Sequence, residues 1–512
     1  MRPALVFIGF MGAGKSTALA AARDAGLETT EIDAVMEAEL GMPIVAAFER
    51  LGEEGFRARE AEVVGALLAS ADGGAIALGG GSVLSERIRA ALARHVVVWL
   101  QVDARESWRR IAHSDRPLAT SAADVAELMA VREPLYEELA DAVIPMGDRD
   151  VVARAMTYLV ALVGLPAGTR LLWATSASGE YPVYVGPGLL GPLGRDAWPL
   201  VRKRFCITDS AVGPLYAERL GPLAATVEVP PGERAKTLAE AERVLRQLAL
   251  AGMTREDHVV ALGGGVVGDL AGLCAHLYQR GVRIVQVPTT LVAQVDSAYG
   301  GKTGVDLPEG KNYVGAFHPP SAVVADTDTL ASVPDQDLAA GFVEALKTGL
   351  LVGGRLWERV RSIETIDPAR LGDVIFACAR YKCEVVAEDE RDSGRRQELN
   401  LGHTVGHAIE AASGYERYRH GEAIGLGLLA ALRLSEAPRL REECELILKR
   451  FGLPVRLDPE TDVEALLDAL QRDKKRTIAG VGFVLLSAPG EPRVGQLVDP
   501  ARVRSAVEEL LG

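Results

Sequence analysis

The chain has 512 residues, which is too long for a single hydrophobic core, so we expect two to four domains. Its formal net charge of −14, from 56 basic and 70 acidic residues, argues against nucleic acid or an anionic membrane as the main partner. Hydrophobic residues make up 48% and charged residues 25%, which is typical of a folded globular protein.

The chain shows no pattern for export or membrane insertion. The apolar run that begins at Ala4 is too short for a signal peptide and is interpreted as a first strand. The longest later apolar stretch, residues 423–432, is too short to cross a bilayer. The five cysteines are odd in number and form no Cys-x-x-Cys pair. We therefore expect a protein of the reducing cytoplasm that does not associate with membranes.

Residues 1–165 alternate short apolar runs with helical patterns. The predicted strands cover 4–9, 75–78 and 95–102, and the predicted helices cover 15–25 and 54–69. This alternation predicts a parallel sheet flanked by helices. The periodicity then fails among small and polar residues, which predicts a linker over 166–172.

A second α/β pattern follows over 173–331. Its predicted strands include 204–208, 258–262 and 283–287. From residue 332 to residue 512 the pattern is mainly helical, with one late strand predicted over 482–488. The sequence therefore predicts an α/β part that is followed by a helical part.

The first predicted strand leads into a phosphate-binding loop. Gly9-x4-Gly14-Lys15-Ser16 satisfies the P-loop pattern and stands between a strand and a helix, so a chance glycine-rich turn is a poor alternative. Backbone N–H groups of such a loop surround phosphate oxygens, the lysine reaches the β- and γ-phosphates, and the hydroxyl of Ser16 is expected on Mg²⁺. The expected ATP contacts in the loop are Gly12, Ala13, Gly14, Lys15, Ser16 and Thr17.

The motifs that follow the P-loop indicate the phosphate acceptor. They are Glu31-Ile-Asp33, Leu51–Glu60, Gly79–Gly81, Arg109-Arg110, Asp115–Leu118 and Arg132–Tyr136. In order and spacing, across nearly all of 1–165, this series resembles shikimate kinase. Arginine forks of this kind bind a carboxylate in bidentate fashion.

The resemblance implies ATP- and Mg²⁺-dependent phosphorylation of shikimate. It implies that shikimate is bound by Asp33, Arg57, Gly80 and Arg132. It also implies that ATP is contacted by Arg110 and Arg116, and that the catalytic residues are Lys15, Asp33 and Arg116. Where the family usually has Asp-x-Asp, this chain has Glu31-x-Asp33, so we expect altered metal or ATP handling. Another small-molecule P-loop kinase, or a half that has decayed into a binding module, is the alternative.

A second glycine signature lies near the middle of the chain. Gly263-x-Gly265-x-x-Gly268 follows a predicted strand and formally matches the dinucleotide fingerprint, but it lacks the acidic residue that such a unit places about 20 residues later. Asp209 ends an earlier predicted strand and is suited to hold a ribose. Lysines in the later glycine-rich loops are suited to phosphate oxygens.

Three histidines lie close together in a chain that has only eight. His403 and His407 are four residues apart and share a helix face, and His420 follows. Spacing alone therefore indicates a zinc-type site formed by these three side chains, with a hydrogen-bonded core histidine as the alternative for any one of them.

Over about 172–512 the chain resembles 3-dehydroquinate synthase, and this resemblance implies a different ligand set. The metal, Zn²⁺ or Co²⁺, would be held by Glu344, His403 and His420, whereas His407 would lie near the substrate phosphate. The implied NAD⁺ contacts are Asp209, Glu233, Lys236, Gly264, Gly265, Val266, Asp269, Thr289, Thr290, Lys302 and Lys311. The implied substrate contacts are Asp296, Lys302, Asn312, Lys347, Lys382, Arg396, Asn400, His407 and Lys474.

The family also implies a homodimer, because Arg280 matches an arginine that the neighbouring subunit lends to the phosphate site. The implied catalytic residues are Lys302, Lys347, Lys382, Arg396, Asn400 and His407. Asp392 stands where the family commonly has Glu, and we do not include it among them.

The implied reaction converts 3-deoxy-D-arabino-heptulosonate 7-phosphate into 3-dehydroquinate and phosphate. NAD⁺ would transiently oxidise a carbinol that the metal polarises, phosphate would leave by elimination, and the returned hydride would precede an aldol ring closure. An NAD- and metal-dependent polyol dehydrogenase or another sugar-phosphate cyclase is the alternative. The expected architecture is α/β: a P-loop kinase domain with a parallel sheet, a Rossmann-like NAD domain over 173–331, and a mainly helical metal-binding domain over 332–512.

Overall fold

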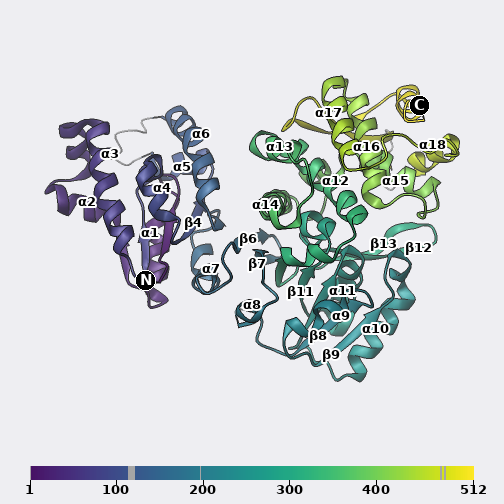
Figure 1. Ribbon diagram of the computed structural model, residues 1–512, viewed down its shortest axis with the longest axis horizontal. Helices are drawn as coiled ribbons and strands as arrows, with labels where there is room; N and C mark the ends of the chain where they lie inside the picture. Colours follow the sequence, from purple (N-terminus) through teal and green to yellow (C-terminus); the bar gives the residue numbers. More distant parts are fainter. Residues whose placement is uncertain (1, 113–120, 197, 473–475, 478–479, 512) are drawn as a thin grey trace. The chain divides into compact units, whose positions relative to one another are not determined.

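The computed structural model describes residues 2–112, 121–196, 198–472, 476–477 and 480–511 (Figure 1). The chain divides into two units. The N-terminal unit comprises 1–174, 182–184 and 196–199, and the C-terminal unit comprises 175–181, 185–195 and 200–512. Among the described helices, none is both long and apolar enough to cross a membrane.

The N-terminal unit contains a parallel sheet in the order β2-β3-β1-β4-β5. Its strands are β1 (Leu5–Ile8), β2 (Thr29–Glu31), β3 (Ala75–Ala77), β4 (Val96–Gln101) and β5 (Ala142–Pro145). All four residues of β1 are buried, as expected for a strand covered on both faces. From β1 the chain crosses to β2 on one side, and from β3 it crosses to β4 on the other, so the carboxyl end of β1 lies at a switch point of the topology.

Helices connect these strands. They are α1 (Lys15–Asp24), α2 (Ile32–Leu40), α3 (Ile44–Ser70), α4 (Glu86–Leu92), α5 (Ala104–Ile111), α6 (Ala122–Leu139) and α7 (Val151–Leu162). The predicted strands and helices of this part are confirmed, with one addition. The helix predicted over 54–69 is the second half of α3, which is interrupted at Gly52 by a left-handed φ of 70°.

The expected linker over 166–172 overlaps a strand. β6 (Arg170–Ser176) begins inside it, pairs in parallel with β5, and is followed by β7 (Gly179–Gly186). Leu171, Leu172 and Trp173 are buried, so these residues belong to a sheet rather than to an exposed connection. The predicted linker is therefore too long at its carboxyl end, because the small and polar residues end at Thr169 and the strand begins at Arg170.

Five further parallel strands, in the order β14-β11-β10-β8-β9, form the α/β part of the C-terminal unit. Its strands are β8 (Arg204–Asp209), β9 (Ala225–Val229), β10 (His258–Gly263), β11 (Arg283–Pro288) and β14 (Ala322–Asp326). The neighbouring helices are α8 (Pro192–Asp196), α9 (Gly213–Tyr216), α10 (Leu238–Leu250) and α11 (Gly265–Leu277). An antiparallel hairpin, β12 (Lys302–Leu307) and β13 (Gly310–Phe317), packs on α11.

The rest of the C-terminal unit is mainly helical, as predicted (Figure 1). Its helices are α12 (Asp335–Val352), α13 (Gly354–Arg361), α14 (Gly372–Glu388), α15 (His403–Ala412), α16 (His420–Leu434), α17 (Pro438–Arg450), α18 (Val463–Arg472) and α19 (Pro500–Glu508). The late predicted strand is β16 (Gly480–Leu486), which pairs with β15 (Arg476–Thr477) and β17 (Pro492–Leu497), two strands that the sequence analysis did not predict.

Close helix packing holds the two histidine-bearing helices together. A Cβ atom at Gly427 in α16 would lie 2.0 Å from the carbonyl oxygen of Gly402, which precedes α15. A Cβ atom at Gly421 would lie 1.8 Å from the carbonyl oxygen of Ala340 in α12. The absence of side chains at these two positions lets α16 approach both neighbours.

Replacing Gly427 with Ala should destabilise the C-terminal unit, because α15 and α16 would have to separate to make room for the methyl group. Overpacking of this kind costs about 1–3 kcal/mol, and thermal unfolding followed by circular dichroism should show a lower Tm. The control is Gly372→Ala, since a Cβ atom there meets nothing within 4 Å. Equal Tm values for the two variants would contradict this account of the packing.

Candidate active sites

The P-loop of the N-terminal unit links β1 to α1. Gly14 precedes α1 with a left-handed φ of 91°, and a Cβ atom at Gly9 would lie 2.6 Å from the carbonyl oxygen of Leu100. Both positions therefore require glycine. Lys15 donates from Nζ to the carbonyl oxygens of Gly9 and Phe10, at 2.9 and 3.0 Å. The lysine thus lies over the loop whose N–H groups are expected to hold phosphate.

A cavity of about 360 Å³ opens beside this loop. Its lining includes Gly12, Gly14, Lys15, Ser16, Thr17, Glu31, Asp33, Gly80 and Arg110. The hydroxyl of Ser16 donates to Oε1 of Glu31 at 2.8 Å. The longer side chain that replaces the usual aspartate therefore reaches the hydroxyl expected on Mg²⁺.

Arg110 is held against the P-loop by protein groups. It donates to the carbonyl oxygens of Gly12 and Met146, at 3.0 and 2.7 Å, and to Oε1 of Glu106 at 2.7 Å. Hydrogen bonds from Arg109 and Arg110 lower the pKa of Glu106 to about 2. The guanidinium is thereby fixed at the cavity edge, and the expected adenine contact remains a prediction.

Arg57 is oriented by a buried carboxylate that the sequence analysis did not select. Its Nη1 donates to Oε2 of Glu60 at 2.6 Å, and Oε1 of Glu60 accepts from the hydroxyl of Ser82 at 2.6 Å. A Cβ atom at Gly81 would lie 2.2 Å from Arg57 Nη2, so the guanidinium passes close over the loop that contains Gly80. The signal for Glu60 is its spacing, three residues after Arg57 on one helix face.

Arg132 is buried beside Phe10, with Cζ 5.6 Å from the ring centroid. One turn later on α6, Tyr136 donates its hydroxyl to the carbonyl oxygen of Gly80. Burial raises the pKa of Tyr136, so the phenol remains a donor. Arg116 lies outside the described residues.

The dinucleotide-type loop of the C-terminal unit follows β10 and ends where α11 begins. β8 connects to β9 on one side and the chain returns to β10 on the other, so the carboxyl ends of β8 and β10 flank a switch point of the topology. Asp209 ends β8, and its Oδ1 accepts from the N–H groups of Ala211 and Val212, at 2.9 Å each. A Cβ atom at Gly264 would lie 2.9 Å from Thr290, which leaves no room there for a side chain.

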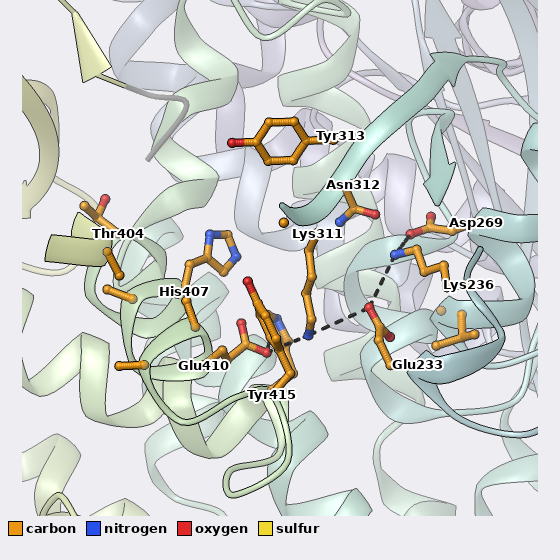
Figure 2. A pocket seen from close by; sticks show the side chains of 18 of the residues that line it. Glu233, Lys236, Asp269, Lys311, Asn312, Tyr313, Thr404, His407, Glu410 and Tyr415 are labelled. Atoms are coloured by element: carbon orange, nitrogen blue, oxygen red, sulfur yellow. Dashed lines mark hydrogen bonds and ion pairs between the residues drawn. The ribbon is translucent and has the colours of Figure 1, made fainter. Parts of the chain in front are cut away.

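Next to this loop lies a cavity of about 740 Å³ that is lined in part by charged side chains (Figure 2). Nζ of the buried Lys236 lies 2.7 Å from Oδ2 of Asp269 and 3.7 Å from Oε1 of Glu233. The cavity is also lined by Gly265, Val266, Asp296, Lys311, Asn312, Glu344, His407, Glu410 and His420. It thus brings together members of the expected NAD⁺, substrate and metal sets.

Glu344, His403 and His420 form the metal-type cluster among the described residues. One ligand atom from each lies within 4.8 Å of the others. Oε1 of Glu344 lies 3.4 Å from His403 Nε2 and 3.5 Å from His420 Nε2. The three-histidine set indicated by spacing is wrong, because it includes His407 and omits Glu344. Glu344 lies on α12, and the spacing of residues along α15 gives no sign that this carboxylate is near.

The donor set fits a divalent cation. Nδ1 of His403 lies 3.1 Å from the carbonyl oxygen of Leu401, which can only accept, so Nδ1 carries the proton and Nε2 is free for a metal. Both carboxylate oxygens of Glu344 are buried: Oε2 lies 2.5 Å from Nζ of Lys347, and Oε1 faces the two histidine nitrogens. Burial lowers the pKa of His403, which favours the neutral imidazole that metals bind.

A second charged cluster adjoins the metal-type site. It is centred on Asp296, which lies in a π-helical turn over Ala293–Ser297. Nζ of Lys382 lies 2.8 Å from Asp296 Oδ1, and Nζ of Lys347 lies 3.8 Å from the same oxygen. Burial alone would raise the pKa of Asp296, but the charges of Lys382 and Lys347 lower it to about 2. Irregular helical turns of this kind are frequent at functional sites.

Lys302 pairs with Asp392, which the sequence analysis set aside. The Lys302 side chain is half exposed, and its partial desolvation lowers its pKa to about 8; the charges of Arg396 and Lys382 add to this effect, and Asp392 opposes it. Arg396 is 1% exposed and donates to the carbonyl oxygens of Glu390 and Gly300. The signal for Asp392 was its place four residues before Arg396.

Several predicted residues do not line the cavity. Arg280 is exposed, with a left-handed φ of 68°, and Asp209 lies at the end of β8. Also outside the lining set are Gly264, Thr289, Thr290, Lys302, Lys347, Lys382, Arg396, Asn400 and His403. Lys474 lies outside the described residues.

Comparisons with known proteins agree with both resemblances. The family model for shikimate kinase matches residues 11–162. Models for the N-terminal and C-terminal parts of 3-dehydroquinate synthase match residues 226–340 and 341–476. The 3-dehydroquinate synthase of Symbiobacterium thermophilum is 44% identical over 351 residues, which are 65% of this chain and 98% of that protein.

Two solved structures resemble the larger part of the chain. One is a 2-deoxy-scyllo-inosose synthase complexed with carbaglucose-6-phosphate, NAD⁺ and Co²⁺, with 27% identity and a TM-score of 0.59 over 67% of this chain and 100% of that one. The other is a 2-epi-5-epi-valiolone synthase from Streptomyces hygroscopicus with NAD⁺ and Zn²⁺ bound, with 26% identity and a TM-score of 0.56 over 64% of this chain and 96% of that one.

Replacing Asp392 with Asn should lower the pKa of Lys302 below 8, because burial and the charges of Arg396 and Lys382 would act without the opposing carboxylate. NMR titration of ¹³C-methylated lysines measures this pKa directly. As a control, Asp367→Asn removes an exposed carboxylate that pairs with Arg370 and should leave the Lys302 resonance unchanged. An unshifted pKa in the Asp392 variant would contradict the proposed electrostatics.

Proposed function

The chain belongs to the 3-dehydroquinate synthase family, and its residues 11–162 match shikimate kinase; we propose that one polypeptide carries both activities. The N-terminal unit would phosphorylate shikimate with ATP and Mg²⁺. The C-terminal unit would convert 3-deoxy-D-arabino-heptulosonate 7-phosphate into 3-dehydroquinate and phosphate, with NAD⁺ and Zn²⁺ or Co²⁺. The observation that carries the proposal is that each unit has its own cavity, one beside the P-loop and one beside the Glu344–His403–His420 cluster.

In the kinase, we assign the phosphate contacts to the P-loop and the acceptor contacts to residues around Gly80. Lys15 lies where it can turn from the loop carbonyls to the transferred phosphate, and Asp33 shares its cavity. Phosphoryl transfer depends mainly on positioning and charge neutralisation, so Asp33 would orient the attacking hydroxyl. Arg57, oriented by Glu60, and the buried Arg132 are suited to a carboxylate. Ser16 would hold Mg²⁺, with Glu31 fixing its hydroxyl.

In the synthase, bound NAD⁺ supplies reversible hydride transfer and the bound metal supplies a Lewis acid. We assign the metal to Glu344, His403 and His420, and the dinucleotide to the loop before α11 with Lys236, Asp269 and Glu233. Lys302, Lys347, Lys382 and Arg396 would bind a substrate that carries both a carboxylate and a phosphate. A simple polyol dehydrogenase has no use for this set of cations, which favours the cyclase.

His407 lines the synthase cavity but lies outside the metal-type cluster. Its ring centroid is 5.3 Å from that of His403 and 6.2 Å from that of His420. We therefore assign it to the substrate phosphate, where an imidazole can exchange a proton with the leaving group.

We propose a homodimer formed through the C-terminal unit, and we place the protein in the cytoplasm. Arg280 does not line the cavity of its own subunit, which agrees with a role in the site of a second copy. All five cysteines are free and buried, which is typical of a reducing compartment.

The test of the whole proposal is a pair of assays on the intact chain. One follows ADP formation with ATP and shikimate, and the other follows phosphate release from the heptulosonate phosphate with NAD⁺, alongside metal analysis. Both activities are expected. Binding of shikimate without ADP formation would instead support a decayed N-terminal half.

Replacing Lys15 with Ala should reduce kinase turnover by about 10²–10³-fold, because a positive charge directed at the developing phosphate charge is lost. Phosphate release by the synthase should stay within about twofold of the parent, since an independent site does not use this lysine. The same two assays measure both effects. Loss of both activities would contradict separate active sites.

Replacing His420 with Ala should remove one of three metal ligands. Loss of a residue that only supports a metal ligand typically weakens metal binding by about 10–100-fold, so loss of a ligand itself should weaken it more. Metal content after dialysis and synthase activity should both be lost, while ADP formation is retained. A variant that keeps its full metal content would show that the ligand set is wrong.

A further inference from the structure

A buried carboxylate next to the metal-type cluster has no role among the expected site residues. Glu410 is 2% exposed and lies on α15, seven residues and two helical turns after His403. Its Oε2 is buried and has no hydrogen-bond partner among the described residues. A carboxylate buried in this way is costly unless it is paired, so its partners indicate its purpose.

The first partner is the metal-type ligand His420. Oε1 of Glu410 lies 3.4 Å from Nδ1 of His420, and a carboxylate can only accept, so Nδ1 carries the proton. Nε2 of the same ring faces Oε1 of Glu344, 3.5 Å away, so Nε2 is the nitrogen directed at the cluster. The contact thus selects the tautomer in which the nitrogen that faces the cluster is free to bind a cation.

The second partner is a lysine from the α/β part of the unit. Nζ of Lys311, on β13, donates to the same Oε1 at 3.0 Å. Nζ also lies 3.7 Å from Glu233 Oε1 and 4.9 Å from the ring centroid of Tyr415. Figure 2 shows Glu410 and Lys311 meeting from opposite sides of the cavity. The carboxylate is therefore held in place by an element other than its own helix.

We propose that Glu410 is a positioning residue of the metal site: fixed by Lys311, it orients the ring of His420 and selects its metal-binding tautomer. The inference rests on the proposed function for the existence of the metal site. It assigns the orientation of one ligand to a residue that is not itself in the ligand set.

The test measures metal affinity rather than activity. The full-length protein is freed of metal by dialysis against a chelator and titrated with Zn²⁺ in competition with a chromophoric chelator. Co²⁺ is titrated in parallel, because its visible spectrum reports ligand geometry. Two variants of matched size are compared: Glu410→Met removes the acceptor, and Glu410→Gln keeps an acceptor oxygen but removes the charge.

We expect Glu410→Met to weaken Zn²⁺ binding by about 10–100-fold and to change the Co²⁺ spectrum. Glu410→Gln should stay within about threefold of the parent with an unchanged spectrum, since its amide oxygen still accepts from Nδ1. Glu416→Gln is the matched control: Glu416 lies near the same helix and also pairs with the α/β part, through Arg234, but it is exposed, so its loss should leave Zn²⁺ affinity unchanged.

Parent-like Zn²⁺ affinity in Glu410→Met would overturn the proposal, and so would a Glu410→Gln variant as weak as Glu410→Met. Should Glu410→Met fail to fold, Glu410→Asp replaces it: the shorter side chain withdraws the acceptor from His420, and parent-like affinity in that variant would overturn the proposal equally. A parent protein that binds no Zn²⁺ would refute the metal site of the proposed function itself, which is a different outcome.

Discussion

The chemistry of the C-terminal unit depends on the balance of charge around one buried carboxylate. Glu344 and Lys347 are each 1% exposed and lie on successive turns of α12, with Nζ of the lysine 2.5 Å from Oε2 of the glutamate. Burial opposes ionisation of Glu344, yet the charge of Lys347, together with the close contacts of His403 and His420, holds its pKa well below the usual range. The same lysine contacts Asp296, which in turn pairs with Lys382. One helix therefore connects the metal-type ligands with the cations that suit an anionic substrate, and each of these buried charges has an opposite charge beside it.

In the N-terminal unit the constraint is a backbone geometry. The P-loop turns from β1 into α1 through glycines that no larger residue could replace, and this turn directs N–H groups into the cavity. The side chains around it are then fixed by protein partners: Glu31 holds Ser16 and Glu60 holds Arg57. A site prepared in this way spends little binding energy on ordering its own residues when the ligands arrive.

Much of the fold could be predicted from the sequence because its signals are local. The strands that contain Leu5, Phe205 and Ile284 are apolar runs bounded by breaking residues, and the P-loop is a contiguous motif. Where a local signal misled, as at the linker over 166–172, buried Leu171 and Leu172 pair with Ala142 and Val143 of β5, a strand on the far side of α7 in the sequence. The pairing of β16 with β15 and β17 was missed for the same reason, since the residues of one strand do not indicate which other strand it pairs with.

The sequence by itself determined the two-part organisation, the phosphate-binding loops and the types of residue available for catalysis, because these are patterns along a continuous stretch of chain. Only the tertiary structure decided which residues act together. It brought Glu344 to His403 and His420, which lie 59 and 76 residues later in the sequence, and it left His407 outside that cluster. It also paired Glu60 with Arg57, Asp392 with Lys302 and Glu410 with His420. The physical reason is that a buried charge must find its partner in space, and helix packing, not sequence distance, sets which charges meet.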